Sequence, residues 1–224
     1  DIRAALEVRL SVLTRRNIGK VFQCRESVPS IEHLLKVPSI IELDALAPEQ
    51  ACLLTLFFLT ILREHLKLVP MNGKNLRHVV FIEEAHNVVG STEPALASPD
   101  IANPKAFAAE YICRMLVEMR ALGVGMVIID QFPSAVAPEV IKSTATKIAF
   151  RQVAKRDREE LGESMLFSET DTEDIARLNK GEAFFFTEGY HRPRRIRVTN
   201  IFKQGSFPVT VSDRDILPYL KEDV

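Results

Sequence analysis

The sequence predicts an α/β fold, with a mostly parallel sheet and helices on both faces. Two continuous apolar runs, His78–Ile82 and Val124–Ile129, have the composition of strands buried on both sides in a parallel sheet. Two long helical patterns begin at Pro48 and Pro104, and proline suits the first turn of a helix. Strands that alternate with helices in this way are typical of β-α-β units, whose strands run parallel.

The composition is that of a globular protein and names no partner. The chain has 224 residues, of which 46% are hydrophobic and 26% charged, and we expect a single α/β domain over residues 1–224. Its formal net charge of -1 gives the whole chain no attraction to nucleic acid or to an anionic membrane. Any such binding must therefore come from local clusters or from assembly.

The cysteines and the N-terminus favour a cytoplasmic protein. Cys24, Cys52 and Cys113 are far apart and form no CxxC pair, as expected of reduced thiols. No stretch of the sequence resembles a secretion signal or has the apolar length that a bilayer span needs. The sequence begins at Asp1 without a methionine, inside a predicted helix, so we expect it to be a piece of a longer protein.

The N-terminal third of the chain predicts two helices and two short strands. Residues 2–16 place leucines at helical spacing, with charged residues between them, which indicates an amphipathic helix. Val21–Cys24 and Ser39–Leu43 are predicted as short strands. The helix that begins at Pro48 is apolar on all sides, so we expect it to be buried.

The remainder of the chain continues the alternation. Residues 87–103 form a long connection, which we expect to be flexible or to depend on a partner for order. The helix from Pro104 is expected to end at Gly123, which can adopt the left-handed conformation that stops a helix. Further strands are predicted at Ile148–Phe150, Ala183–Phe186 and Ile196–Val198.

Two adjacent carboxylates follow the predicted strand His78–Ile82. Glu83 and Glu84 would stand at its carboxyl end, where open α/β sheets bind their ligands. Such a pair is a Walker B arrangement, in which one carboxylate holds hydrated Mg²⁺ beside nucleotide phosphates and the next polarises the attacking water. A solvated acidic turn after an ordinary strand is the alternative interpretation.

Two other predicted strands end in polar residues that suit phosphate chemistry. Gln131 follows Val124–Ile129, and its amide could hydrogen-bond a terminal phosphate or the lytic water. Arg151 follows Ile148–Phe150, and a guanidinium near a phosphate stabilises developing charge, in cis or across a subunit boundary. An exposed strand end and a surface salt bridge are the respective alternatives.

The order of these blocks resembles that of HerA-type ATPases, which belong to the same group as the FtsK and TraG motors. The similarity extends from about Ala5 to Val198, and the order of the blocks is more specific than any single block. The blocks are the strand and helix of Pro38–Leu62, Glu83-Glu84-Ala85-His86, Met119-Arg120-Ala121-Leu122-Gly123, Gln131-Phe132-Pro133-Ser134, Lys147–Arg151, Gly181-Glu182-Ala183 and Arg192-Pro193-Arg194-Arg195. The resemblance implies a RecA-like P-loop NTPase core.

The same resemblance implies a motor that couples ATP hydrolysis to the translocation of DNA or protein. In such a motor, Glu83 would be the magnesium-side acid, acting through water, and Glu84 the catalytic base. Gln131 would sense the phosphate, and Arg151 would face the phosphates or a subunit interface. The complete enzyme would use ATP and Mg²⁺ in a homo-oligomeric ring, a hexamer, with DNA and a nuclease as candidate partners and no membrane association.

The sequence departs from the HerA pattern at two points. Glu83 stands where Asp is commoner, and its extra methylene would shift the carboxylate outward from the metal. The phosphate-binding loop GxxxxGK[ST] is missing, since neither Gly19-Lys20 nor Gly73-Lys74 has the required flanking residues. We therefore expect residues 1–224 to bind ATP weakly or not at all, as the Walker B part of an ATPase core or, alternatively, as a non-enzymatic scaffold derived from one.

Three weaker interpretations remain beside the motor ATPase. A zinc site at Glu83, Glu84 and His86 is disfavoured, because there is no HExxH pattern and no partner cluster of His or Cys. The Glu-Glu-Ala-His string also resembles the motif of DEAH-type helicases, but their paired arginine motif is absent. The basic cluster of Arg192–Arg197 could contact nucleic acid, a neighbouring subunit or the nucleotide; a solvated edge strand is the simpler explanation.

Overall fold

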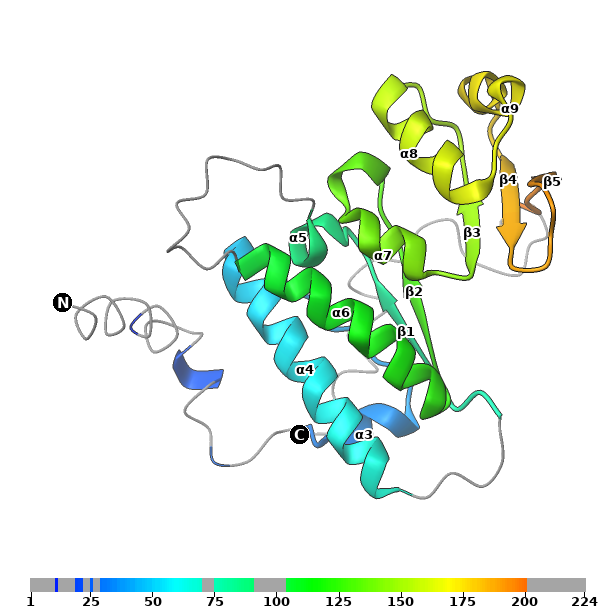
Figure 1. Ribbon diagram of the computed structural model, residues 1–224. Coiled ribbons are helices and arrows are strands. Elements are labelled where there is room, and N and C mark those ends of the chain that lie inside the picture. Colours follow the sequence, from blue (N-terminus) through cyan, green and yellow to red (C-terminus); the bar gives the residue numbers. More distant parts are fainter. Residues whose placement is uncertain are drawn as a thin grey trace. The chain divides into compact units, whose positions relative to one another are not determined.

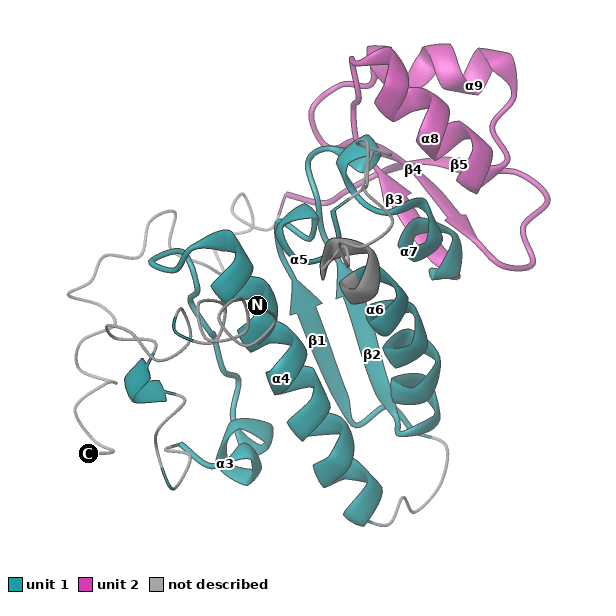
Figure 2. Ribbon diagram, turned by 60° about the vertical axis from the view of Figure 1, so that its left-hand side comes forward, with its two compact units in different colours: residues 1–144 teal, residues 145–224 magenta. Residues whose placement is uncertain are grey.

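The computed structural model describes residues 11, 19–21, 25, 29–69, 75–90 and 104–200. The chain divides into two compact units, residues 1–144 and 145–224 (Figure 2). The prediction of one domain over residues 1–224 stays a prediction. The helix expected at residues 2–16, the strand expected at Val21–Cys24 and residues 91–103 of the long connection lie wholly or largely outside the described residues.

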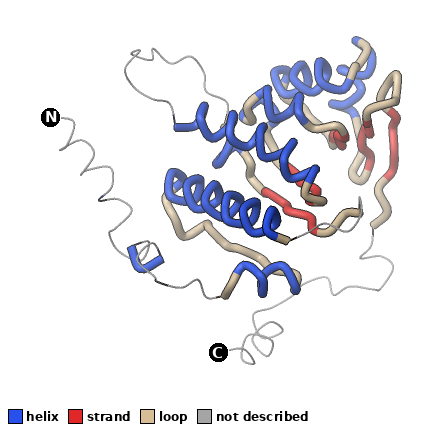
Figure 3. The backbone as a smooth tube through the Cα atoms, turned by 60° about the horizontal axis from the view of Figure 1, so that its bottom comes forward, coloured by secondary structure: helices blue, strands red, loops and turns tan. Residues whose placement is uncertain are grey.

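Unit 1 is organised around the parallel pair β1 (His78–Ile82) and β2 (Val124–Ile128), with His78 opposite Val124 and Ile82 opposite Ile128. Helices α4 (Pro48–Leu68) and α6 (Pro104–Ala121) run side by side along this pair (Figures 1 and 3). A parallel pair needs a crossover connection, and α6 supplies it. The α/β class with a parallel sheet and helices is therefore confirmed.

The core of unit 1 lies between these helices and one face of the sheet. Buried side chains of both helices meet Ile82 and Val124, and Val80, Met126 and Ile128 pack against the same cluster. The helix residues that are almost inaccessible are Leu59, Leu62 and Leu66 of α4 and Ile112, Met115 and Met119 of α6. Side chains on the other face of the sheet, Val79, Phe81 and Val127, are exposed among the described residues.

Local signals set the ends of the two long helices. Proline occupies the first turn of α4, with Glu49 beside it at the positive end of the helix dipole. Gly123 follows α6 with a φ of 76°, the left-handed conformation that glycine adopts at no steric cost. Its carbonyl oxygen then accepts a hydrogen bond from the backbone N–H of Arg77, at 2.7 Å, which starts the alignment of β2 with β1.

Two local predictions in unit 1 are wrong. Ser39–Leu43 forms no strand, and Ile40 is 90% exposed, because the β-branched residues of this run pair with no strand in the part of the chain that the structure describes. Residues 87–89, expected to open a loop, belong to the short helix α5 (His86–Val89). Other short elements of unit 1 are α3 (Ile31–Lys36), the 3-10 turn η1 (Pro133–Ala135) and α7 (Pro138–Ser143).

Unit 2 contains an antiparallel sheet in the order β3-β4-β5. The strands are β3 (Thr146–Ala149), β4 (Glu182–Thr187) and β5 (Arg194–Arg197), close to the three predicted runs. We expected these runs to continue the parallel sheet, but the short turn between β4 and β5 makes a hairpin, and a hairpin can only be antiparallel. The helical elements of unit 2 are α8 (Lys155–Met165), α9 (Glu169–Asp174) and the 3-10 turn η2 (Ile175–Arg177).

The core of unit 2 packs the helices on β3 and β4. Met165 and Ile175 are fully buried against Ala149, Leu178 and Phe184.

Across the stretches that the structure describes, no helix of either unit combines the length and the apolar composition that a membrane span requires.

Candidate functional site

The carboxyl ends of β1 and β2 meet at one edge of the unit 1 sheet, because the two strands are parallel. Beyond the strands themselves, the backbone N–H of Ile129 donates to the carbonyl of Ile82 at 2.9 Å. The N–H of Ala85 then donates to the carbonyl of Ile129 at 3.2 Å. These bonds hold the turn at residues 83–85 against the turn at residues 129–132.

Two of the predicted site residues are in direct contact at this edge. Nε2 of Gln131 donates a hydrogen bond to Oε1 of Glu84, at 2.7 Å. The Glu84 side chain is 43% exposed, so that its carboxylate can be reached from solvent. The sequence predicted both residues from separate strand ends, and the parallel pairing brings them together.

Glu84 holds a backbone conformation that non-glycine residues rarely adopt. Its φ is 47°, in the left-handed region, which costs a residue with a Cβ roughly 1–2 kcal/mol. Its carbonyl oxygen accepts from the N–H of Asn87 at 2.9 Å, and the other side of the same peptide group, the N–H of Ala85, donates to the carbonyl of Ile129. Strain of this kind persists where surrounding contacts determine the backbone, and it gathers at functional sites.

Asp130 is the residue of this edge to which sequence reasoning gave no role. Its side chain is only 6% exposed, and Oδ2 accepts from the backbone N–H of His86 at 2.8 Å. The same Oδ2 lies 2.9 Å from Nδ1 of His86, and Oδ1 accepts from the N–H of Phe132 at 2.8 Å. The sequence did contain a signal for Asp130, because this acid stands directly between a predicted buried strand and Gln131.

Glu84, His86 and Asp130 each offer a ligand atom, and these atoms lie within 4.8 Å of one another. The set differs from the disfavoured zinc set, because Asp130 replaces Glu83. Three of the roughly four acceptor positions of the Asp130 carboxylate are already used by donors of the protein. The Asp130 carboxylate is therefore satisfied by hydrogen bonds from within the protein.

The other two predicted residues are not partners in the hydrogen bond between Glu84 and Gln131. Glu83 is exposed at the end of β1, next to Glu84 in the chain. Arg151 belongs to unit 2, where it follows β3 and its Nε donates to the carbonyl of Ala176 at 3.1 Å. The roles of Glu83, Glu84, Gln131 and Arg151 in catalysis stay predictions.

The basic cluster of unit 2 is largely engaged within its own sheet. Arg195 lies 2.8 Å from Glu182 and Arg197 lies 3.5 Å from it, while Arg194 stacks on the ring of Tyr190 at 4.4 Å. The hydrogen bond from Arg195, followed by that from the backbone of Asn179, lowers the pKa of Glu182 to about 2. These contacts fit the interpretation of β5 as a charged edge strand.

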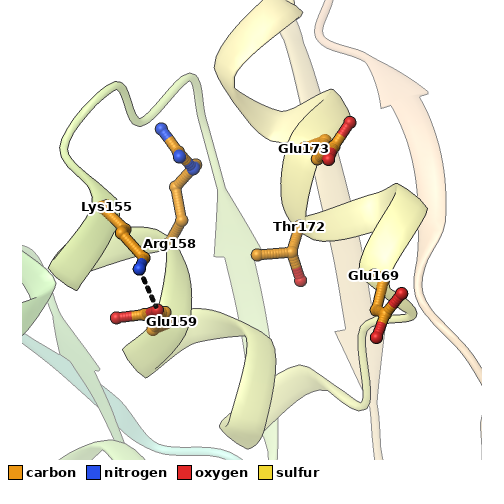
Figure 4. Close-up of a pocket in the computed structure, with 6 residues that line it drawn as sticks. All are labelled: Lys155, Arg158, Glu159, Glu169, Thr172 and Glu173. Carbon is orange, nitrogen blue, oxygen red and sulfur yellow. Dashed lines mark ion pairs between the residues drawn. The ribbon is translucent and has the colours of Figure 1, made fainter.

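A pocket of about 330 Å³ lies between α8 and α9 in unit 2 (Figure 4). Its lining has mixed charge, with Lys155 and Glu159 paired at 3.6 Å, and contains none of the predicted site residues. The residues that line it are Lys155, Arg158, Glu159, Glu169, Thr172 and Glu173. Nothing in this lining selects one class of ligand.

Comparison with known proteins gives one curated relative and a set of similar folds, while no family model matches the chain. The sequence is 31% identical over 134 residues to the DNA double-strand break repair helicase HerA of Pyrococcus furiosus. The match covers 54% of this chain and 24% of HerA, so the chain corresponds to about a quarter of that relative. The resemblance to HerA/FtsK-type P-loop ATPases is thereby confirmed.

A solved structure agrees with the fold. The genome packaging NTPase B204 of Sulfolobus turreted icosahedral virus 2, in complex with AMP, matches with a TM-score of 0.50 at 14% identity. That match covers 76% of this chain and 72% of B204. VirB4 of Thermoanaerobacter pseudethanolicus matches with a TM-score of 0.48 at 14% identity, over 75% of this chain and 38% of VirB4.

Proposed function

We propose that this relative of HerA/FtsK-type P-loop ATPases is the part of a motor ATPase that carries the Walker B carboxylates. The whole protein would couple ATP hydrolysis to the movement of DNA or protein. The observation that carries the proposal is the 2.7 Å hydrogen bond between Gln131 and Glu84 at the carboxyl end of two parallel strands. Phosphoryl transfer depends mainly on positioning and charge stabilisation, and this edge holds both groups in place.

The roles follow from where each side chain stands. Glu84 would accept a proton from the attacking water, and its contact with Gln131 would keep the carboxylate oriented. Gln131 would bond the water or a phosphate through its side-chain amide, which can both donate and accept hydrogen bonds. Arg151 would stabilise phosphate charge from unit 2 or across a subunit boundary.

Magnesium is the metal that this proposal requires, and the carboxylates at the end of β1 suit it. Glu83 and Glu84 offer hard oxygen ligands at an exposed position, which is the donor type that hydrated Mg²⁺ takes. Glu83 would hold the ion through water. When bound, Mg²⁺ would neutralise charge on the phosphates.

A Walker A loop would have to come from outside residues 1–224, since this sequence contains no GxxxxGK[ST]. HerA is matched over about a quarter of its length. We therefore also propose that the whole protein hydrolyses ATP, assembles into a hexameric ring, works with DNA or a nuclease as partner and is located in the cytoplasm. Residues 1–224 alone would bind ATP weakly or not at all.

The variant Glu84→Gln in the full-length protein tests the proposed function. It should leave ATP binding intact and abolish hydrolysis, because an amide cannot accept the proton but keeps the shape of the carboxylate. Glu163→Gln, an exposed glutamate of α8, is the matched control and should hydrolyse ATP at the wild-type rate. Hydrolysis that continues unchanged in Glu84→Gln would remove Glu84 from the catalytic role.

A non-enzymatic scaffold is the second candidate, and the missing phosphate loop favours it. The sequence of the full-length gene separates the two functions. A GxxxxGK[ST] motif upstream of Asp1 supports the motor, and its absence there supports the scaffold.

A further inference from the structure

We propose that Asp130 is a positioning residue that holds Glu84 and Gln131 in their working arrangement, acting through His86 and through the turn at Phe132. The inference rests on the proposed function, because it takes Glu84 as the base. It assigns a role to a buried acid for which the proposed function has no use.

One carboxylate holds both turns of the site. Oδ2 of Asp130 accepts from the backbone N–H of His86 at 2.8 Å, which fixes the β1 side two residues after Glu84. Oδ1 accepts from the backbone N–H of Phe132 at 2.8 Å, which fixes the β2 side one residue after Gln131. Since the Asp130 side chain is only 6% exposed, water cannot readily replace either bond.

We call the two hydrogen bonds that the Asp130 carboxylate accepts from His86 and Phe132 the clamp. The imidazole of His86 extends this clamp to Glu84. Its Nδ1 lies 2.9 Å from Oδ2 of Asp130 and 3.6 Å from Oε2 of Glu84. Both neighbours are carboxylate oxygens, which accept hydrogen bonds, so Nδ1 carries the proton and gives its stronger bond to Asp130. Glu84 is left with Oε1 bonded to Gln131 and with a hydrogen-bond donor beside Oε2.

The substitution Asp130→Asn removes one acceptor and adds a donor in nearly the same volume. An amide has one oxygen, so either the turn at His86 or the turn at Phe132 must face an NH₂ group. Whichever turn loses its bond, the distance between Glu84 and Gln131 is no longer held from both sides. Loss of such supporting contacts costs roughly 10–100-fold in activity, and small displacements of reacting groups have effects of similar size.

The first measurement concerns the clamp alone and needs no hydrolysis. Long-range ¹H–¹⁵N spectra of the histidines in residues 1–224, assigned with a His86→Asn variant, report which ring nitrogen of His86 is protonated. We expect the Nδ1–H form in the wild type and an altered His86 signal in Asp130→Asn. Asp157→Asn, which changes a buried aspartate of α8, is the matched control and should leave the His86 signal in place.

The second measurement is the ATPase kinetics of the full-length protein. Asp130→Asn should lower kcat by roughly 10–100-fold with little change in KM, and should leave ATP binding unchanged in a Glu84→Gln background. A general loss of structure would instead weaken ATP binding in both backgrounds.

The outcomes separate the two proposals. Protonation of His86 on Nε2 alone, or a normal kcat in Asp130→Asn while Glu84→Gln is inactive, would overturn the positioning role and leave the proposed function standing. Wild-type hydrolysis in Glu84→Gln would remove the proposed function and, with it, any catalytic purpose for the clamp.

Discussion

Replacing Glu84 with either glycine or alanine separates its backbone strain from the loss of its carboxylate. Both variants lose the hydrogen bond to Gln131, so the difference between them depends on the backbone at a φ of 47°. Alanine in the left-handed region costs roughly 1–2 kcal/mol, whereas glycine adopts it freely. Glycine also lowers the free energy of unfolding by roughly 0.5–1 kcal/mol relative to alanine, because the unfolded chain has more conformational freedom at a glycine. We therefore expect Glu84→Gly to be more stable than Glu84→Ala by about 0.5–1 kcal/mol.

The assay is urea unfolding of residues 1–224, with the two midpoints compared at a common slope. Val117, which is 71% exposed within α6 of the same unit, supplies the control pair. There the order should reverse, and Val117→Ala should be more stable than Val117→Gly by about 1 kcal/mol, because glycine is the poorer residue in a helix. If alanine were the more stable replacement at both positions, the left-handed strain at Glu84 would be refuted.

Two further predictions concern the core and the charged edge strand. Leu62 of α4 is 1% exposed in the unit 1 core, and Leu62→Ala should lower the free energy of unfolding by about 2–5 kcal/mol. A change below ~1 kcal/mol, measured by urea unfolding, would contradict this packing. The lowered pKa of Glu182, about 2 against an ordinary 4.5, means that its ion pair with Arg195 stabilises the folded state above pH 4.5 and is lost as the pH falls toward 2. Carboxyl NMR should show Glu182 titrating near pH 2 and shifting upward in Arg195→Gln, and a wild-type midpoint near 4.5 would exclude the pairing.

The elements that the sequence predicted best are those with strong local signals. Proline in the first turn and continuous apolar spacing define α4 and α6, and uninterrupted apolar runs define β1 and β2. Glu84 and Gln131 could be predicted as neighbours, because parallel strands end at the same edge of a sheet.

The features that could not be predicted depend on partners distant in the chain. Ser39–Leu43 has the residues of a strand, but no described segment lies beside it as a strand, whereas β3 pairs with β4, which follows only after two helices. The contact between His86 and Asp130 joins residues from different strand ends, and the left-handed φ of Glu84 is imposed by the turn around it. Local propensity contains no information about such contacts.

The crossover that makes β1 and β2 parallel also decides when the site can first exist during folding. Helices such as α4 can form from contacts between near neighbours in the chain, but β1 cannot meet β2 until the whole segment between them, α6 included, has closed into a loop. An intermediate with helical circular dichroism would therefore lack the edge where Glu84 and Gln131 meet. Recovery of the site during refolding should follow the closure of this loop rather than the appearance of helix.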